Sequence, residues 1–215
     1  MLSDHWQSVH ETHHQAQTLQ NNFQAHFCVG LGKQQNIEIA TERLLLQPLE
    51  TSDATALFGY RSLPEVSQYQ SWIPNDVADA ERFIASSTAH PFDTVGTWFQ
   101  FGIRGFESGE LLGDLGVHFP DGDRQQIELG ITVAPAHQRR GIAGEALVAT
   151  LRYAFQSLRK HRAYASVDPR NQASMALLQR IGMRQEAHFH QSVWCNGEWA
   201  DDVIFAALAT EWHAP

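Results

Sequence analysis

The chain has 215 residues, of which 43% are hydrophobic, and a formal net charge of −9. This length suits one domain with its own core and a short appendage. The negative charge argues against general binding to nucleic acids or anionic membranes, and it favours cationic partners such as amines or basic peptide segments. The two cysteines, Cys28 and Cys195, form neither a disulfide framework nor a CxxC motif, so we expect a reducing, cytoplasmic location.

The apolar runs of the sequence are short. None approaches the roughly 18 residues that a membrane-spanning helix needs. The first residues also lack the basic segment and apolar core of a signal peptide. We therefore expect no membrane partner.

Residues 1–36 differ in composition from the rest, because they are rich in Gln, His and Asn and contain few apolar residues. We expect them to form a polar arm, either helical or partly disordered, ahead of a single domain over residues 37–215. His10 and His14 are four residues apart, as helical metal ligands can be. No carboxylate–histidine pattern of a known metalloenzyme accompanies them, so we expect no metal.

Strand-like and helical patterns alternate in the first half of the domain. A strand is predicted from Ile39 to Leu49, with Pro48 marking its end, and Ser52 or Asp53 can cap the helix that follows. The other elements predicted before residue 134 are a helix at 54–61, a loop around Pro64 and Pro74, a helix starting at Asp76 or Asp79, and strands at 97–104, 111–119 and 127–133. Short turns join the last three strands, which predicts an antiparallel meander.

A strand, a short loop and a helix follow one another between Ile127 and Leu158. The loop reads Gln138-Arg-Arg-Gly-Ile-Ala-Gly144, which places two guanidinium groups beside two glycines. Free amides at a helix start carry partial positive charge, and glycine lets a ligand approach the backbone, so this pattern is typical of a phosphate-binding loop. A Walker A loop is excluded because Gly-Lys-Ser/Thr is missing. An ordinary glycine-containing turn with solvated arginines remains the alternative from these residues alone.

The remaining elements follow this helix in order. A strand is predicted at 163–167 and a helix at 172–180, capped by Asn171 and ended by Gly182. Two alternating segments, 188–194 and 200–207, surround Asn196-Gly197. Asn-Gly between two strand-like runs predicts a hairpin.

Several of these stretches resemble the GNAT acetyltransferases. The loop Gln138-Arg-Arg-Gly-Ile-Ala143 is similar to the Gln/Arg-x-x-Gly-x-Gly/Ala signature with which that family cradles the pyrophosphate of acetyl-CoA. The run from Asn171 to Gly182 looks like the family's second signature and lies some 30 residues beyond the loop. Thr41-Glu-Arg-Leu-Leu-Leu and the closing hairpin with Glu211-Trp212 resemble the Rim-type branch, which acetylates protein N-termini. The resemblance covers about residues 39–212.

This resemblance implies an α/β (α+β) GNAT fold. Its mixed central sheet would have about six or seven strands, largely antiparallel, with a splayed parallel pair at the acetyl-CoA site and helices on both faces. It also implies that acetyl-CoA, the expected co-substrate, is bound by Ile131, Thr132, Val133, Gln138, Arg139, Arg140, Gly141, Ile142, Ala143, Gly144, Asn171 and Ser174. Among these, Val133 would pair with pantetheine through its backbone, and Asn171 would bond the pantetheine amide.

Acetyl transfer from a thioester to an amine makes three chemical demands. The amine must lose a proton, the tetrahedral oxyanion must be stabilised, and the departing thiolate must be accommodated. A lysine amine has a pKa near 10.4 and an α-amine a pKa of about 8, so an N-terminal acceptor needs a base less. The resemblance implies Glu128 as that base, with His118, or water alone, as the alternative. Backbone N–H groups near Thr132 or Val133 would stabilise the oxyanion.

The thiolate is the point at which the sequence departs from the family. Many GNAT enzymes use a tyrosine as the acid, but Leu177-Leu178 stand at the matching positions. Ser174, one turn into the helix, is the Rim-like alternative for bonding the sulfur. The catalytic residues implied are therefore Glu128 and Ser174.

The acceptor is less defined by the sequence. Tyr69 and Trp72 in the proline-flanked loop are candidates to line its pocket, together with His118, although aromatic residues of this kind also belong commonly to a core. The predicted function is acetyl-CoA-dependent N-acetyl transfer by direct attack in a ternary complex, preferentially onto a protein N-terminal α-amine. The alternatives are a small-molecule amine acetyltransferase and a catalytically silent acyl-CoA-binding module. Both a monomer and a homodimer stay open.

Overall fold

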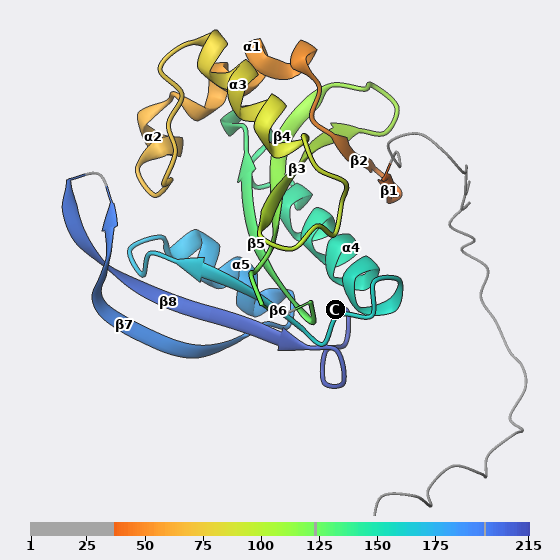
Figure 1. Ribbon diagram of the computed structural model, residues 1–215, viewed down its shortest axis with the longest axis vertical. Coiled ribbons are helices and arrows are strands. Elements are labelled where there is room, and N and C mark those ends of the chain that lie inside the picture. Colours follow the sequence, from red (N-terminus) through yellow and green to blue (C-terminus); the bar gives the residue numbers. More distant parts are fainter. Residues whose placement is uncertain (1–36, 123, 196) are drawn as a thin grey trace, which may run out of the picture.

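The computed structural model describes residues 37–122, 124–195 and 197–215, so the expected arm and its histidines lie outside the described residues. Within these ranges, eight strands form a single sheet in the order β1-β2-β3-β4-β5-β6-β8-β7 (Figure 1). The strands are β1 (Ile39–Ala40), β2 (Leu44–Pro48), β3 (Thr97–Gly105), β4 (Leu111–Phe119), β5 (Gln126–Val133), β6 (Arg162–Val167), β7 (Arg184–Cys195) and β8 (Glu198–Leu208). The mixed, largely antiparallel sheet is confirmed.

The sheet has eight strands because the segment predicted as one strand from Ile39 to Leu49 turns back on itself. Thr41 makes this turn: its Oγ1 accepts a hydrogen bond from the backbone N–H of Leu44 at 2.9 Å. The two-residue β1 then pairs antiparallel with β2, with Ile39 opposite Leu46. Pro48 ends β2, as predicted.

The helices are α1 (Ala54–Arg61), α2 (Pro64–Ser67), α3 (Val77–Ser87), α4 (Ile142–Gln156) and α5 (Gln172–Arg180), with 3₁₀ turns at Thr51–Asp53 and Pro135–His137. The loop predicted around Pro64 therefore contains a short helix, and Pro64 occupies its first turn, where a missing N–H costs nothing. Asp76 caps α3 by accepting from the N–H of Asp79 at 2.7 Å. Within the described ranges no helix is long and apolar enough to cross a membrane.

The position of the N-cap predicted for α1 is confirmed, but the capping hydrogen bond is not formed. Asp53 occupies the N-cap position, but its side chain makes no capping bond to that helix. Its carboxylate accepts instead from the backbone N–H of Glu50 at 2.9 Å and from Arg104 at 2.6 Å. Asp53 thus ties the start of α1 to strand β3.

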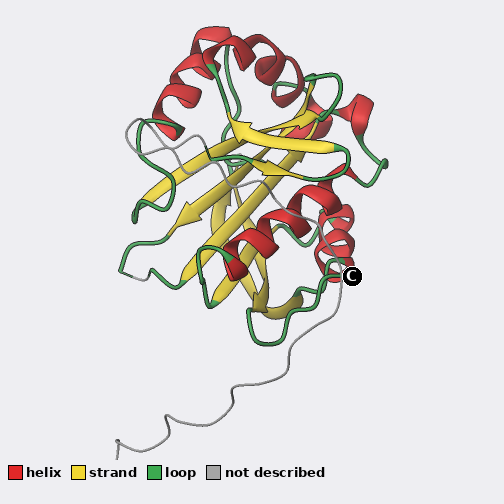
Figure 2. Cartoon of the chain, turned by 90° about the vertical axis from the view of Figure 1, so that its right-hand side faces the viewer, coloured by secondary structure: helices red, strands yellow, loops and turns green. Residues whose placement is uncertain are grey.

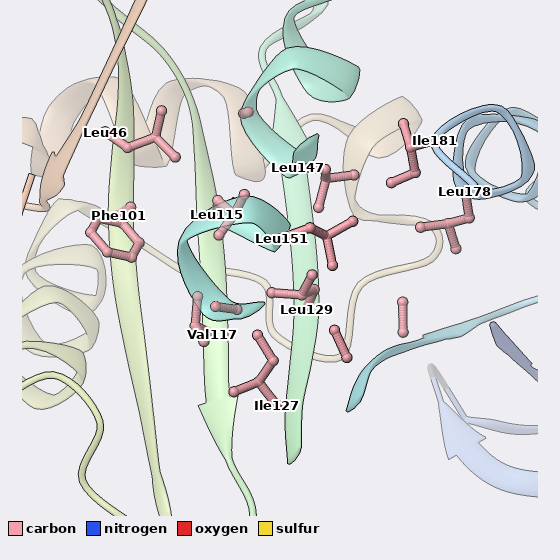
Figure 3. Close-up of a cluster of buried hydrophobic side chains, with 14 of the residues drawn as sticks. Leu46, Phe101, Leu115, Val117, Ile127, Leu129, Leu147, Leu151, Leu178 and Ile181 are labelled. Atoms are coloured by element: carbon pink, nitrogen blue, oxygen red, sulfur yellow. The ribbon is translucent and has the colours of Figure 1, made fainter. Parts of the chain in front are cut away.

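Helices cover both faces of the sheet, as expected (Figure 2). On one face α4 and α5 pack on a continuous apolar core, in which Leu147 and Leu151 of α4 approach strand residues such as Leu115 (Figure 3). On the other face a smaller cluster joins α1 and α3 through Leu57 and Ile84. This second cluster covers only part of its face, which leaves room for a site beside it.

The parallel pair β5 and β6 is splayed. Their pairing is limited to three positions, Gln126 with Arg162, Ile127 with Ala163 and Glu128 with Tyr164. Both strands continue beyond this point, β5 to Val133 and β6 to Val167, without pairing to each other. The sheet therefore opens directly after Glu128.

Candidate active site

A cavity of about 400 Å³ lies at the opening between β5 and β6. Its walls come from the α1–α3 region, from strands β3 to β6, from α5 and from the hairpin of β7 and β8. The predicted site residues that line it are Tyr69, Trp72, Glu128, Ile131, Thr132, Asn171 and Ser174. Residues far apart in the sequence thus meet around one space.

Strand register explains why the polar residues of β3 to β6 share one face. Trp98 lies opposite His118, His118 opposite Glu128, and Glu128 opposite Tyr164. Side chains at paired positions point to the same side of a sheet. Because Glu128 is the last residue of β5 that pairs with β6, its side chain stands at the edge of the opening.

Glu128 is held from two sides. Its Oε2 lies 3.2 Å from Nδ1 of His118 and accepts a hydrogen bond from the hydroxyl of Tyr164 at 3.3 Å. The ring of Trp98 stacks on His118, with 4.8 Å between centroids. Burial and the nearby Glu128 carboxylate raise the pKa of Tyr164 to about 12, so Tyr164 is a neutral donor near pH 7. His118 contacts Glu128 but does not itself line the cavity.

The floor of the cavity includes two glycines opposite each other, Gly116 on β4 and Gly130 on β5. A Cβ atom on Gly116 would meet Gln100 Oε1 at 2.8 Å and Trp98 at 3.0 Å, whereas one on Gly130 would lie 4.0 Å from Trp98. The indole of Trp98 therefore lies over this floor, and the missing side chain of Gly116 makes room for it.

A buried ion pair forms the inner end of the wall. Asp114 is fully buried and pairs with Arg61, whose Nε lies 3.1 Å from Oδ1. The hydroxyl of Tyr60 donates to the same oxygen at 2.6 Å, and the amide of Gln100 donates to Oδ2. Burial, together with the Asp114 carboxylate, raises the pKa of Tyr60. With these donors, the buried charge of Asp114 is fully paired.

Aromatic side chains cover that ion pair on the cavity side. Trp72 stacks on Phe83 with 4.1 Å between ring centroids, and the guanidinium of Arg61 lies 5.5 Å from the Trp72 ring. Trp72 thus belongs both to the smaller core cluster and to the cavity wall. Tyr69 reaches across the mouth, where its hydroxyl lies 3.4 Å from the carbonyl oxygen of Arg170.

The opposite wall is the start of α5. Asn171 caps this helix as predicted, because its Oδ1 accepts from the N–H of Ser174 at 3.1 Å. Ser174 and Leu177 both line the cavity. On β5, Thr132 is buried, and its hydroxyl is the one buried side-chain oxygen or nitrogen in the described ranges that lacks a hydrogen-bond partner.

The loop from Gln138 to Gly144 lies outside this cavity, at the N-terminus of the 15-residue helix α4. Gly141 is the N-cap residue and has φ 80°, a left-handed conformation that favours glycine. Arg139 and Arg140 are exposed, and neither forms an ion pair with another described residue. Ile142 is buried beneath them, while Ala143 and Gly144 are half-buried.

Two side chains brace the loop. The amide of Gln138 donates to the carbonyl oxygen of Val133 at 2.9 Å, which ties the loop to the end of β5. Arg43 donates to the carbonyl oxygen of Arg140 at 3.2 Å and forms an ion pair with Glu145 of α4. Both contacts fix the strand-to-helix turn, and Arg43 adds a third guanidinium beside it.

Comparison with known proteins shows the family of the chain. A family model described as "Acetyltransferase (GNAT) domain" matches residues 43–184. The chain belongs to the GNAT acetyltransferase family. A Bacillus licheniformis protein named "Uncharacterized N-acetyltransferase p20" is 31% identical over 80% of this chain and 96% of its own length. The "[Ribosomal protein uS5]-alanine N-acetyltransferase" of Escherichia coli is 26% identical over 82% of this chain and 93% of its own length.

Solved structures agree with this assignment. "Mycobacterium smegmatis RimJ in complex with CoA-disulfide" is similar with a TM-score of 0.69 and 25% identity, over 78% of this chain and 83% of that chain. The GNAT fold, the N-acetyltransferase class and the Rim-like branch predicted from the sequence are confirmed.

Several residues of this GNAT cavity escaped the sequence analysis. Asp114, Arg61 and Trp98 line or support the cavity, yet none belongs to a recognisable motif. One signal was present, since a charged residue within the apolar strand 111–119 needs a buried partner. That partner is Arg61, and it could not be predicted because it depends on how α1 packs on β4.

Proposed function

We propose that this protein transfers the acetyl group of acetyl-CoA to an amine, and that the acceptor is the α-amine of a protein N-terminus. The observation that carries the proposal is the position of Glu128 on the cavity where β5 and β6 part, with Ser174 on the same cavity. Acetyl-CoA supplies the activated acetyl thioester. The acceptor assignment is supported by the Rim-type relatives, one of which is named for acetylating an alanine of a ribosomal protein.

The residues present fit such a co-substrate. Beyond Glu128, β5 no longer pairs with β6. The unpaired backbone N–H and C=O groups on this edge of β5 can bond an extended amide chain. The unpartnered hydroxyl of Thr132 lies on this stretch. At its end, the left-handed Gly141 and the exposed Arg139 and Arg140 flank the start of α4, where an anionic phosphate is favoured.

Gly141→Asp tests the phosphate end of this site. The variant places a negative charge beside the phosphates, so acetyl-CoA affinity should fall by about 2–4 kcal/mol, the scale of one or two lost charged hydrogen bonds. Gly109→Asp is a matched control, because Gly109 also has positive φ (67°) and nothing within 4 Å of an added Cβ. Calorimetry that found equal acetyl-CoA affinity in both variants would remove the loop from the binding site.

Glu128 is the proposed general base, acting directly or through one water. Tyr164 and His118 both bond Oε2 and thereby fix the carboxylate at the opening. His118 is then a positioning residue that acts through Glu128. His118→Asn should lower turnover only in part while leaving acetyl-CoA affinity unchanged, because Tyr164 still bonds the carboxylate. If His118 were itself the base, the variant would instead lose as much turnover as Glu128→Gln.

Ser174 is the proposed partner of the departing thiolate. It stands one turn into α5 and lines the cavity, while Leu177 occupies a position where many family members carry a tyrosine. Ser174→Ala should lower turnover about 10-fold, the scale of about 1.4 kcal/mol of lost hydrogen bonding, with little change in acetyl-CoA affinity. Unchanged turnover under conditions in which chemistry limits the rate would exclude Ser174 from the mechanism.

The acceptor can be identified with a thiol-release assay. The panel contains peptides with free N-termini, the same peptides with blocked N-termini and internal lysines, and small amines. Faster CoA release with free N-termini supports the proposal, whereas release only with small amines makes the protein a small-molecule acetyltransferase. Acetyl-CoA binding without release above background for any acceptor would indicate a silent acyl-CoA-binding module.

A further inference from the structure

Three side chains outside the proposed chemistry converge on one point of the closing hairpin. His188 and His190 are two residues apart on β7, and Asp201 lies on the neighbouring strand β8. Nε2 of His188 and Nδ1 of His190 lie 2.8 Å and 2.9 Å from the same oxygen, Oδ2 of Asp201. The three potential ligand atoms all lie within 4.8 Å of one another.

The backbone of the hairpin is shaped to make this convergence. The register between β7 and β8 shifts between Phe189 and Val193, and within this irregularity Gln191 adopts a positive φ of 47°. The N–H of Gln191 donates to Oδ1 of Asp201 at 2.9 Å. One carboxylate oxygen is therefore held by the backbone while the other points at the two imidazoles, which is how an outer hydrogen bond orients a metal ligand.

We propose that His188, His190 and Asp201 form a binding site for a divalent transition metal, with Zn²⁺ as the best-suited ion. Two imidazoles and one carboxylate are a ligand set that zinc accepts, with the fourth tetrahedral position left to water or another ligand. A tetrahedral ion about 2.0–2.2 Å from each ligand keeps the ligand atoms roughly 3.3–3.6 Å apart, so each ring nitrogen must move away from the Asp201 oxygen by about half an ångström. None of the three residues has a role in the proposed acetyl-transfer chemistry.

Zinc binding at this cluster should depend on pH. Each coordinated ring nitrogen must present a lone pair. A neutral imidazole does so by carrying its proton on the other nitrogen, and a protonated one must release a proton to solvent. Because protons compete with the ion for the ring nitrogens, zinc affinity should fall as the pH is lowered.

The cluster lies beside the proposed active-site cavity. Asp201 lines the cavity, and its neighbour Asp202 accepts a hydrogen bond from Ser166 of β6 at 2.7 Å. A bound ion braces the hairpin at its irregular register. It also changes the net charge of the three-residue cluster from negative to positive, because a divalent ion outweighs the single carboxylate of Asp201.

Equilibrium dialysis of the full chain against Zn²⁺ at pH 7.5 tests the site, with Co²⁺ as a spectroscopic probe. The arm contains further histidines, so His10→Ala/His14→Ala is the matched control for His188→Ala/His190→Ala. We expect one bound Zn²⁺ and the visible absorption of four- or five-coordinate Co²⁺ in the wild type and in the arm variant. The hairpin variant should lose the Co²⁺ absorption and bind Zn²⁺ more than about tenfold more weakly.

Asp201→Asn keeps the shape of the carboxylate and separates binding from folding. It should also weaken Zn²⁺ binding, and Zn²⁺ should raise the thermal unfolding temperature of the wild type more than that of this variant. Equal Zn²⁺ stoichiometry and equal Co²⁺ absorption in the wild type and Asp201→Asn would overturn the proposal. Absence of Zn²⁺ binding by the wild type would do the same.

Discussion

The two faces of strands β3 to β5 differ in how they are filled. On the face toward α4, Phe101, Leu115 and Val117 are completely buried and belong to one continuous apolar cluster. On the other face the alternate residues include Asp114, which is also completely buried, and Glu128, which stands at the cavity edge. Adjacent residues of one strand, Asp114 and Leu115, therefore lie in opposite environments.

This difference separates stability from function. The apolar face is stabilised by area removed from water, which is non-directional and tolerant of hydrophobic exchange. The polar face depends on specific partners, because a buried charge is tolerated only when its donors are in place. Small changes on the polar face should therefore alter both folding and the cavity, whereas changes on the apolar face should alter folding alone.

The largest effect is expected from Asp114→Ala, which leaves the buried guanidinium of Arg61 without its carboxylate partner. Breaking a buried ion pair in this way costs about 3–5 kcal/mol of unfolding free energy, measured by urea denaturation. Leu115→Ala, one residue along the same strand, should cost about 2–5 kcal/mol through a cavity in the apolar core. The two variants should differ in activity. The folded fraction of Leu115→Ala should keep its turnover, whereas that of Asp114→Ala should lose turnover, because Arg61 no longer holds Trp72 in the cavity wall.

A smaller effect distinguishes the two glycines of the cavity floor. Gly116→Ala must displace Gln100 or Trp98, since the new Cβ would lie within 3.0 Å of both. Overpacking of this kind costs roughly 1–3 kcal/mol, and the affinity for the acceptor should fall as Trp98 moves. Gly130→Ala meets only Trp98 at 4.0 Å and should be neutral or stabilising by up to about 1 kcal/mol, because alanine loses less entropy on folding. Equal denaturation midpoints would contradict this account of the floor.

The smallest effect concerns the pH dependence of stability. The pKa of Tyr164 is about 12 in the folded protein and about 10 in an unfolded chain. The folded state keeps this proton to higher pH, so the contribution of Tyr164 to stability is complete below pH 10 and is lost as the pH rises toward 12. The stability of Tyr164→Phe should therefore fall less steeply than that of the wild type across this range. Tyr69→Phe, whose hydroxyl contacts a backbone carbonyl instead, serves as the control.

Most of the fold could be predicted because it is encoded locally. The strand at 111–119 and the helix at 172–180 match their predicted bounds, since alternation, a capping Asn and a terminating Gly are signals within one element. Elements set by a few residues were missed. The turn at Thr41 and the short helix at Pro64 each depend on one or two hydrogen bonds that leave no periodic pattern.

The site was predictable where it follows a motif and less so where it is assembled by packing. Gly141 and Asn171 are marked by their spacing, and both hold the helix positions expected of them. The pairing of Arg61 with Asp114 joins residues 53 positions apart, and the His188–Asp201 contact depends on a register shift. Such contacts are set by tertiary geometry, which composition and periodicity do not encode.

The most direct test of the account is the rate of CoA release by wild type and Glu128→Gln with a free N-terminal peptide. Glutamine keeps the size of the side chain but cannot accept a proton, so turnover should fall about 10²- to 10⁴-fold, the usual contribution of a general base. Acetyl-CoA affinity, measured by calorimetry on the same samples, should not change. Equal turnover of the two proteins, under conditions in which the chemical step limits the rate, would contradict the assignment of Glu128 and with it the central role of this cavity.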